Sequence, residues 1–85
     1  MEEKELVGTV EHYYTKIGVA VVNLEGNLSV GDKISIEGAT TNIQQTVDSM
    51  QVEHEEVENA KAGDSVGMKV ADRVRPGDQV YKFVS

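Results

Sequence analysis

Hydrophobic and polar residues alternate with a period of two along most of this chain, and no long segment keeps the period of about 3.6 residues that marks a helix. Alternation of this kind is typical of strands that have one face in a core. The stretch 17–24 is apolar on both faces, which indicates a central strand or one that bends sharply as a barrel closes. The predicted strands cover residues 6–14, 17–24, 33–37, 43–52, 66–70 and 80–84.

Short turn signals separate these strands. A Gly-Asp dipeptide occurs three times, and each time a hydrophobic residue follows two places after the aspartate. Glycine adopts positive φ without steric cost, and an aspartate side chain accepts a local backbone hydrogen bond as the next strand begins. The predicted structural turns contain Gly26, Gly31, Asp32, Gly63, Asp64, Gly77 and Asp78, and Pro76 stiffens the last of them.

One segment favours a helical turn. Residues 53–61 are rich in glutamate and place Val57 and Ala60 three positions apart, so that a single turn could plug one end of a barrel. The segment is too short to stand as a helix of its own. The strand and turn pattern therefore predicts an all-β domain over residues 6–84, after a disordered acidic segment over residues 1–5. Closure into a small barrel is favoured over an open sandwich, because open sheet edges invite aggregation.

Composition narrows the possible functions. A chain of 85 residues has room for one domain, and with one Phe and no Trp its core is expected to be aliphatic, without an aromatic-lined cofactor pocket. The absence of cysteine excludes disulfides and thiolate zinc sites. The chain opens with four charged residues after Met1, and no apolar run approaches the ~20 residues needed to span a bilayer. We expect a cytoplasmic protein without a membrane partner.

The net charge of −7 argues against strong non-specific binding to nucleic acid, which requires a basic surface. The charge is unevenly distributed, however. The last segment, 69–85, carries four basic residues against two acidic ones, while the rest of the chain is strongly acidic. Arg73 and Arg75 are therefore candidate partner-binding residues. Neutralisation of neighbouring carboxylates is the simpler interpretation of the same charges.

Catalytic and metal-binding motifs are absent from the sequence. No Gly-Lys pair exists to form a phosphate-binding loop, so we expect no GTP binding by this chain alone. The segment starting at His54 lacks the second histidine of a helical zinc site, because Glu58 stands where that histidine is needed. No serine or threonine lies in a nucleophile-elbow context. We predict no catalytic residue, no metal and no cofactor, and hence no enzyme.

A cluster in the first predicted hairpin is the other candidate for partner binding. Adjacent tyrosines on a strand point to opposite faces, so one of the two is expected to face solvent. An exposed tyrosine beside histidine and lysine suits stacking on a base or a protein hot spot, and it also suits simple coverage of a barrel end. The residues concerned are His12, Tyr13, Tyr14 and Lys16.

The segment 23–38, Asn-Leu-Glu-Gly-Asn-Leu-Ser-Val-Gly-Asp-Lys-Ile-Ser-Ile-Glu-Gly, resembles the central signature of domain two of translational GTPases such as elongation factor Tu and initiation factor two. The likeness continues over nearly the whole chain, at residues 8–10, 47–50, 57, 60–68 and 74–80. It implies a closed six-stranded, Greek-key-like barrel of the translation-protein type. The GTPase domain of the family is missing, so a stand-alone copy of the barrel is expected.

The resemblance favours a non-catalytic binding module that docks on a protein or ribonucleoprotein partner of the translation machinery. A similar barrel is appended to U32 peptidase-like proteins. The alternative is therefore an accessory subunit or domain that positions substrate for a separate enzyme of that kind. Self-association through a barrel edge is a third possibility. An enzyme partner whose binding is insensitive to RNase would favour the second hypothesis.

Overall fold

The computed structural model of the protein describes residues 3–84, and all regular structure in them is β-strand. The strands are β1 (Lys4–Tyr14), β2 (Val19–Leu24), β3 (Leu28–Ser29), β4 (Lys33–Glu37), β5 (Asn42–Thr46), β6 (Met50–Val52), β7 (Glu55–Val57), β8 (Asn59–Ala60), β9 (Ser65–Lys69) and β10 (Gln79–Phe83). The all-β prediction is confirmed. No helix in this part of the chain is long and apolar enough to cross a membrane.

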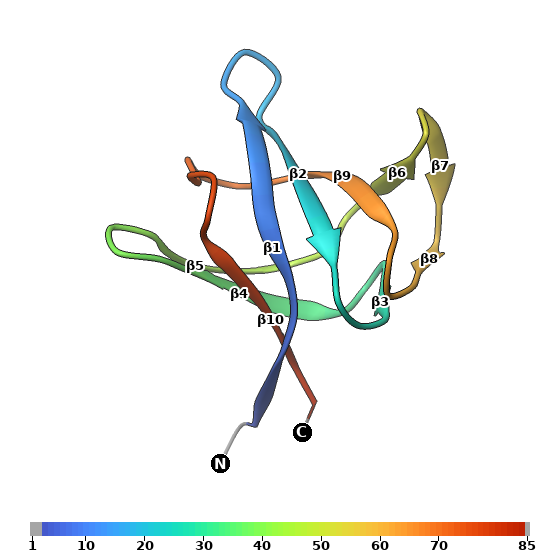
Figure 1. The fold of residues 1–85 in the computed structure, drawn as a ribbon, viewed down its shortest axis with the longest axis horizontal. Helices are drawn as coiled ribbons and strands as arrows, with labels where there is room; N and C mark the ends of the chain where they lie inside the picture. The colour runs from blue at the N-terminus through green and yellow to red at the C-terminus, as the bar shows by residue number, and fades with distance from the viewer. Residues whose placement is uncertain (1–2, 85) are drawn as a thin grey trace.

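Eight strands form one antiparallel sheet in the order β5-β4-β10-β1-β2-β9-β6-β7, and β3 pairs with β8 separately. Figure 1 shows this sheet curling around a common interior, with the β1–β2 loop at one end of the molecule and the start of β1 and the end of β10 at the other. The predicted closed six-stranded barrel is not found. Strands β5 and β7 stand at the two ends of the sheet order and do not pair with each other.

The interior is aliphatic, as the composition indicated. The alternation that predicted each strand places its inward positions in one cluster, against which Tyr13 packs from the edge. The buried apolar residues are Val7, Val10, Ala20, Val22, Leu24, Leu28, Ile34, Ile36, Val47, Met50, Ala60, Val66, Met68, Val70, Val74 and Val80. Burial of this apolar surface is the main favourable contribution to the stability of the fold.

The three Gly-Asp turns share one geometry. Each glycine has a φ close to +95°, and each aspartate donates its backbone N–H to the carbonyl three residues earlier, as in a turn with glycine at its third position. The aspartate carboxylate accepts a hydrogen bond from the backbone N–H of that same earlier residue. These carboxylate bonds join Asp32 to Ser29 at 2.9 Å, Asp64 to Lys61 at 3.1 Å and Asp78 to Arg75 at 2.9 Å.

Each turn also holds one buried residue that lies far from it along the chain. The glycine N–H donates to that residue's carbonyl, and the residue's own N–H donates to the aspartate carbonyl. The residues held in this way are Val47 by Gly31 and Asp32, Leu24 by Gly63 and Asp64, and Val10 by Gly77 and Asp78, all at 2.8–2.9 Å. The turns therefore satisfy backbone groups that would otherwise be buried without partners.

Two local expectations differ from the structure. The helical turn predicted over residues 53–61 is wrong, because this segment forms β7 and β8. Glu53 and His54 both have positive φ, at 52° and 67°, and make the two-residue turn between β6 and β7. Strand β1 begins at Lys4, within the segment 1–5 for which we expected disorder. Residues 1–2 of that segment lie outside the described residues.

Candidate functional site

The open side of the sheet is bridged by one side chain. Gln45, on the end strand β5, donates from Nε2 to the carbonyl of Lys69 at 3.0 Å. Its Oε1 accepts a hydrogen bond from the backbone N–H of Ala71 at 2.7 Å. The side-chain amide thus occupies the place of a neighbouring strand at this point. We call the gap between β5 and the segment after β9 the seam.

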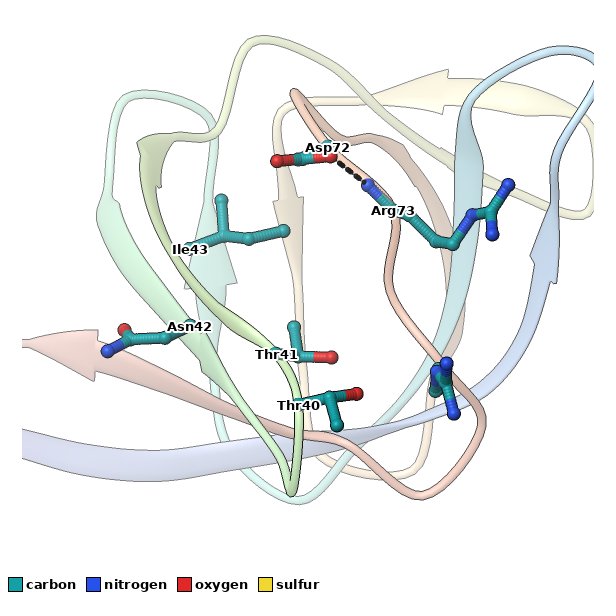
Figure 2. Close-up of a pocket in the computed structure, with 7 residues that line it drawn as sticks. Thr40, Thr41, Asn42, Ile43, Asp72 and Arg73 are labelled. Atoms are coloured by element: carbon teal, nitrogen blue, oxygen red, sulfur yellow. Dashed lines mark hydrogen bonds between the residues drawn. The ribbon is translucent and has the colours of Figure 1, made fainter.

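A groove continues along the seam next to Gln45. Its volume is about 330 Å³, and it lies between the start of β5 and the loop that leads to β10 (Figure 2). In Figure 2 the hydroxyl groups of Thr40 and Thr41 lie on the side that faces this loop. The residues lining this seam groove are Thr40, Thr41, Asn42, Ile43, Asp72, Arg73 and Arg75.

The loop holds its two arginines outward. Val74, between them, is 2% exposed and belongs to the core, so its neighbours on either side point to solvent. The backbone N–H of Arg73 donates to Oδ1 of Asp72 at 2.7 Å, and that of Arg75 donates to Oδ2 of Asp78 at 2.9 Å. Within residues 3–84 neither guanidinium group forms an ion pair or hydrogen bond. Both arginines line this groove, and neither guanidinium has a carboxylate partner among residues 3–84.

The second predicted cluster lies elsewhere. Residues 12–17 line a depression of about 300 Å³ at the β1–β2 loop, so the aromatic cluster and the arginine pair line different cavities. Tyr13 packs against the core, whereas Tyr14 is 49% exposed and its ring meets that of His12 edge-on at 4.3 Å. Ile17 is 63% exposed beside them, although its apolar character suggested a place in a strand.

Sequence reasoning missed the β5 side of the groove. The signal was present but weak, because Asn42–Thr46 alternates poorly and is polar throughout apart from Ile43. Poor alternation of polar and apolar residues is typical of a strand at the end of a sheet. It does not predict which loop lies opposite that strand.

Charge elsewhere near β5 is locally balanced. The Glu37 carboxylate, at the end of β4, accepts hydrogen bonds from the Lys4 ammonium and from the Ser35 hydroxyl. Lys4 first and Ser35 second hold the pKa of Glu37 below its ordinary value, because both favour the ionised carboxylate. Among residues 3–84 no group of three or more histidine, aspartate or glutamate side chains is placed to hold a metal ion.

The arrangement is suited to binding and orienting a ligand. Hydroxyl, amide and guanidinium groups line the groove, and its carboxylate, Asp72, already accepts a backbone hydrogen bond. A threonine hydroxyl needs a general base to become a nucleophile, and no histidine lines this groove to serve as one.

Comparison with known proteins finds relatives that are named as enzymes. It is 45% identical over 76 residues to an uncharacterized protease of Methanocaldococcus jannaschii, covering 88% of this chain and 19% of that protein. It is 39% identical over 83 residues to a collagenase of Porphyromonas gingivalis, covering 95% of this chain and 23% of the relative. The chain therefore spans about a fifth of the length of these relatives.

Two solved structures share the fold of this chain. The C-terminal domain of a putative U32 peptidase from Geobacillus thermoleovorans superimposes with a TM-score of 0.86 at 25% identity, covering 92% of this chain and 91% of that one. Its selenomethionine variant superimposes with a TM-score of 0.85, covering 89% and 96%. At 24% identity, the likeness to the variant shows the fold alone.

These relatives correct the functional prediction. They bear the names of proteases, collagenases and a U32 peptidase, so docking on the translation machinery is wrong as the main interpretation, and so is the description of the chain as an elongation-factor-like component of protein biosynthesis. The alternative, an accessory part of a U32 peptidase-like enzyme, is better supported. The structural resemblance itself is confirmed, since the family model for elongation factor Tu domain 2 matches residues 18–81. The chain belongs to the elongation factor Tu domain 2 family.

Proposed function

We propose that this chain is a non-catalytic accessory module that acts beside a U32 peptidase-like enzyme and holds substrate for it. The observation that carries the proposal is the pairing of two likenesses. The chain matches about a fifth of the length of relatives that are named protease and collagenase, and its fold matches the C-terminal domain of a putative U32 peptidase.

The seam groove supports the same role. It offers two guanidinium groups, two hydroxyl groups and an amide to a ligand, which is a set suited to hydrogen bonding and charge pairing. Holding a substrate next to a catalytic centre makes the reaction effectively intramolecular, so a binding module raises the rate without supplying reactive groups.

The test is direct binding to such an enzyme. Purified chain is titrated by calorimetry into a purified U32 peptidase-like protein from the same genome that lacks a barrel of its own, before and after RNase treatment. We expect a one-to-one complex that RNase does not weaken. We also expect faster hydrolysis of a labelled gelatin substrate when the chain is added, mainly through a lower KM. Absence of binding at tens of micromolar, or hydrolysis by the chain alone, would overturn the proposal.

A further inference from the structure

We propose that the seam groove binds an extended segment of polypeptide, which pairs with the open edge of β5 and places a carboxylate against Arg73 and Arg75. This inference rests on the proposed function and names its substrate class: an acidic peptide in strand conformation. It follows from which residues of β5 direct their backbone N–H and C=O groups away from β4, from the side chains of β5, and from the charges of the facing loop.

Hydrogen bonds beyond both ends of β5 show which of its residues direct their backbone groups toward β4. Beyond one end, the backbone N–H of Gly38 donates to the carbonyl of Thr41 at 2.8 Å. Beyond the other, the backbone N–H of Val47 donates to the carbonyl of Asp32 at 2.9 Å. Thr41 and Val47 therefore direct their backbone groups toward the β4 side, and in an antiparallel pair every second residue does the same.

The residues between them in phase, Ile43 and Gln45, also face β4 with their backbone groups. It follows that Asn42 and Gln44 direct their N–H and C=O groups toward the seam. Among residues 3–84, strand β5 has no paired neighbour on that side, since it ends the sheet order. Backbone donors and acceptors aligned on a free edge form the template to which an extended peptide adds as a further strand.

The two end strands of the sheet differ in how strongly their side chains discourage pairing with another chain. Strand β7 at the other end carries Glu55 and Glu56, both exposed, and charged side chains on an edge discourage pairing with another chain. Strand β5 carries no charge and no proline. Gln45 bridges the seam near the end of β5, and the groove is lined by Asn42 and Ile43 at the start of the strand together with Thr40 and Thr41 just before it. At about 3.4 Å per residue, a strand of three or four residues fits along it.

Charge selects the ligand. An arginine pairs with a carboxylate through two parallel hydrogen bonds, and the two arginines that line the groove have no guanidinium partner among residues 3–84. The chain carries a net charge of −7, so an acidic peptide is repelled from most of its surface and retained at this groove. Asp72 offsets part of the positive charge, which favours carboxylates that approach from the side of the arginines.

The experiment is a titration of the ¹⁵N-labelled protein, followed by amide chemical shifts, with a capped pentapeptide of alternating valine and glutamate. We expect the largest shifts at Asn42 and Gln44 and in the loop 71–75. Replacing the glutamates of the peptide by glutamine should weaken binding about tenfold, and N-methylation of its alternate amides should weaken it as much.

Variants separate the backbone and charge contributions. Gln44→Pro removes an edge N–H that β4 does not use, and proline is tolerated on an edge strand, so the variant should fold normally and lose the peptide. The double variant Arg73→Gln with Arg75→Gln should bind the glutamate and glutamine peptides equally. Its matched control, Lys16→Gln with Lys61→Gln, removes the same charge elsewhere and should bind like the original protein.

Each contrary result has a definite meaning. Shifts confined to residues 12–17, or unchanged affinity in the arginine double variant, would overturn the inference. Tighter binding of an RNA oligonucleotide than of the peptide at the same groove would also overturn it. If the peptide fails to bind while the U32-type enzyme is still captured, only this inference falls. If the peptide binds but no enzyme does, the proposed function falls instead.

Discussion

Replacing Gly38 with alanine sets a methyl group against the carboxylate of Asp78. A Cβ built on Gly38 lies 1.9 Å from Oδ1 and 2.6 Å from Cγ of that side chain, distances that real Cβ atoms do not adopt. The carboxylate is not free to move away. Asp78 is 5% exposed, and its Oδ2 accepts the backbone N–H of Arg75 in the third Gly-Asp turn.

The expected cost follows from these contacts. Displacing the carboxylate breaks a hydrogen bond to a charged group, which contributes about 1.5–3 kcal/mol. Alanine restricts the unfolded chain more than glycine and recovers about 0.4–1 kcal/mol. The net loss is about 0.5–2.5 kcal/mol, and at roughly 4–8 °C per kcal/mol for a domain of this size the Tm should fall by about 2–20 °C.

Thermal unfolding followed by circular dichroism measures this shift, and Gly67→Ala is the matched control. A Cβ on Gly67 meets only Val19 Cγ1 at 3.5 Å, an ordinary contact, so the control should unfold close to the original protein. In an Asp78→Ala background the clash is gone, and Gly38→Ala should then cost almost nothing. Equal Tm values for the two glycine variants, or an undiminished cost in the Asp78→Ala background, would refute the reasoning.

Three further changes probe other parts of the fold. Gln45→Leu removes both hydrogen bonds across the seam. It should lower the free energy of unfolding, measured by urea denaturation, by about 1–3 kcal/mol and speed amide hydrogen exchange along the seam. Unchanged exchange would contradict the bridging role of Gln45. Lys4→Met removes the main cause of the low Glu37 pKa. Because the pKa of Glu37 is lowered in the fold, its carboxylate stabilises the protein at pH values above its ordinary pKa of 4.5, and this stabilisation is lost as the pH falls through the folded pKa. The Tm of the original protein should therefore fall more between pH 7 and pH 3 than the Tm of the variant. Parallel profiles of Tm against pH would argue against the Lys4–Glu37 pair. Gly8→Ala brings a Cβ to 2.8 Å from the Asn23 carbonyl oxygen and should lower Tm clearly more than a surface substitution, whereas an unchanged Tm would show that β1 shifts freely.

The turns were predictable because the interactions that define them are local. The positive φ at a glycine, and the hydrogen bond that the aspartate carboxylate accepts from the backbone N–H three residues earlier, both lie within four consecutive residues. The pairing of each turn with a distant residue such as Val10 or Leu24 depends on where the strands meet, which no local pattern encodes. The dipeptides therefore predicted the positions of the corners and not the strands that the corners hold.

The helical prediction at 53–61 failed for the opposite reason. Glutamate favours helices when packing does not decide, but here pairing of β6 with β7 and of β3 with β8 satisfies the backbone of this segment. The turn between β6 and β7 uses Glu53 and His54 at positive φ, where glycine or asparagine is the usual signal. With that signal missing, the hairpin could not be recognised from the residues.

The expectation of closure was drawn from the hazard of open edges, and the structure meets that hazard with a side chain in place of a strand. Gln45 lies 24 residues from Lys69 and 26 from Ala71 along the chain, so its two seam hydrogen bonds depend on the completed fold. The charged half of the groove, Arg73 and Arg75, was visible in the sequence because charge is local. Its other half becomes a candidate site only once the register of β4 and β5 fixes which backbone groups point outward. A site of this kind depends on which backbone groups of a strand point away from its neighbour, and the pairing with that neighbour decides this.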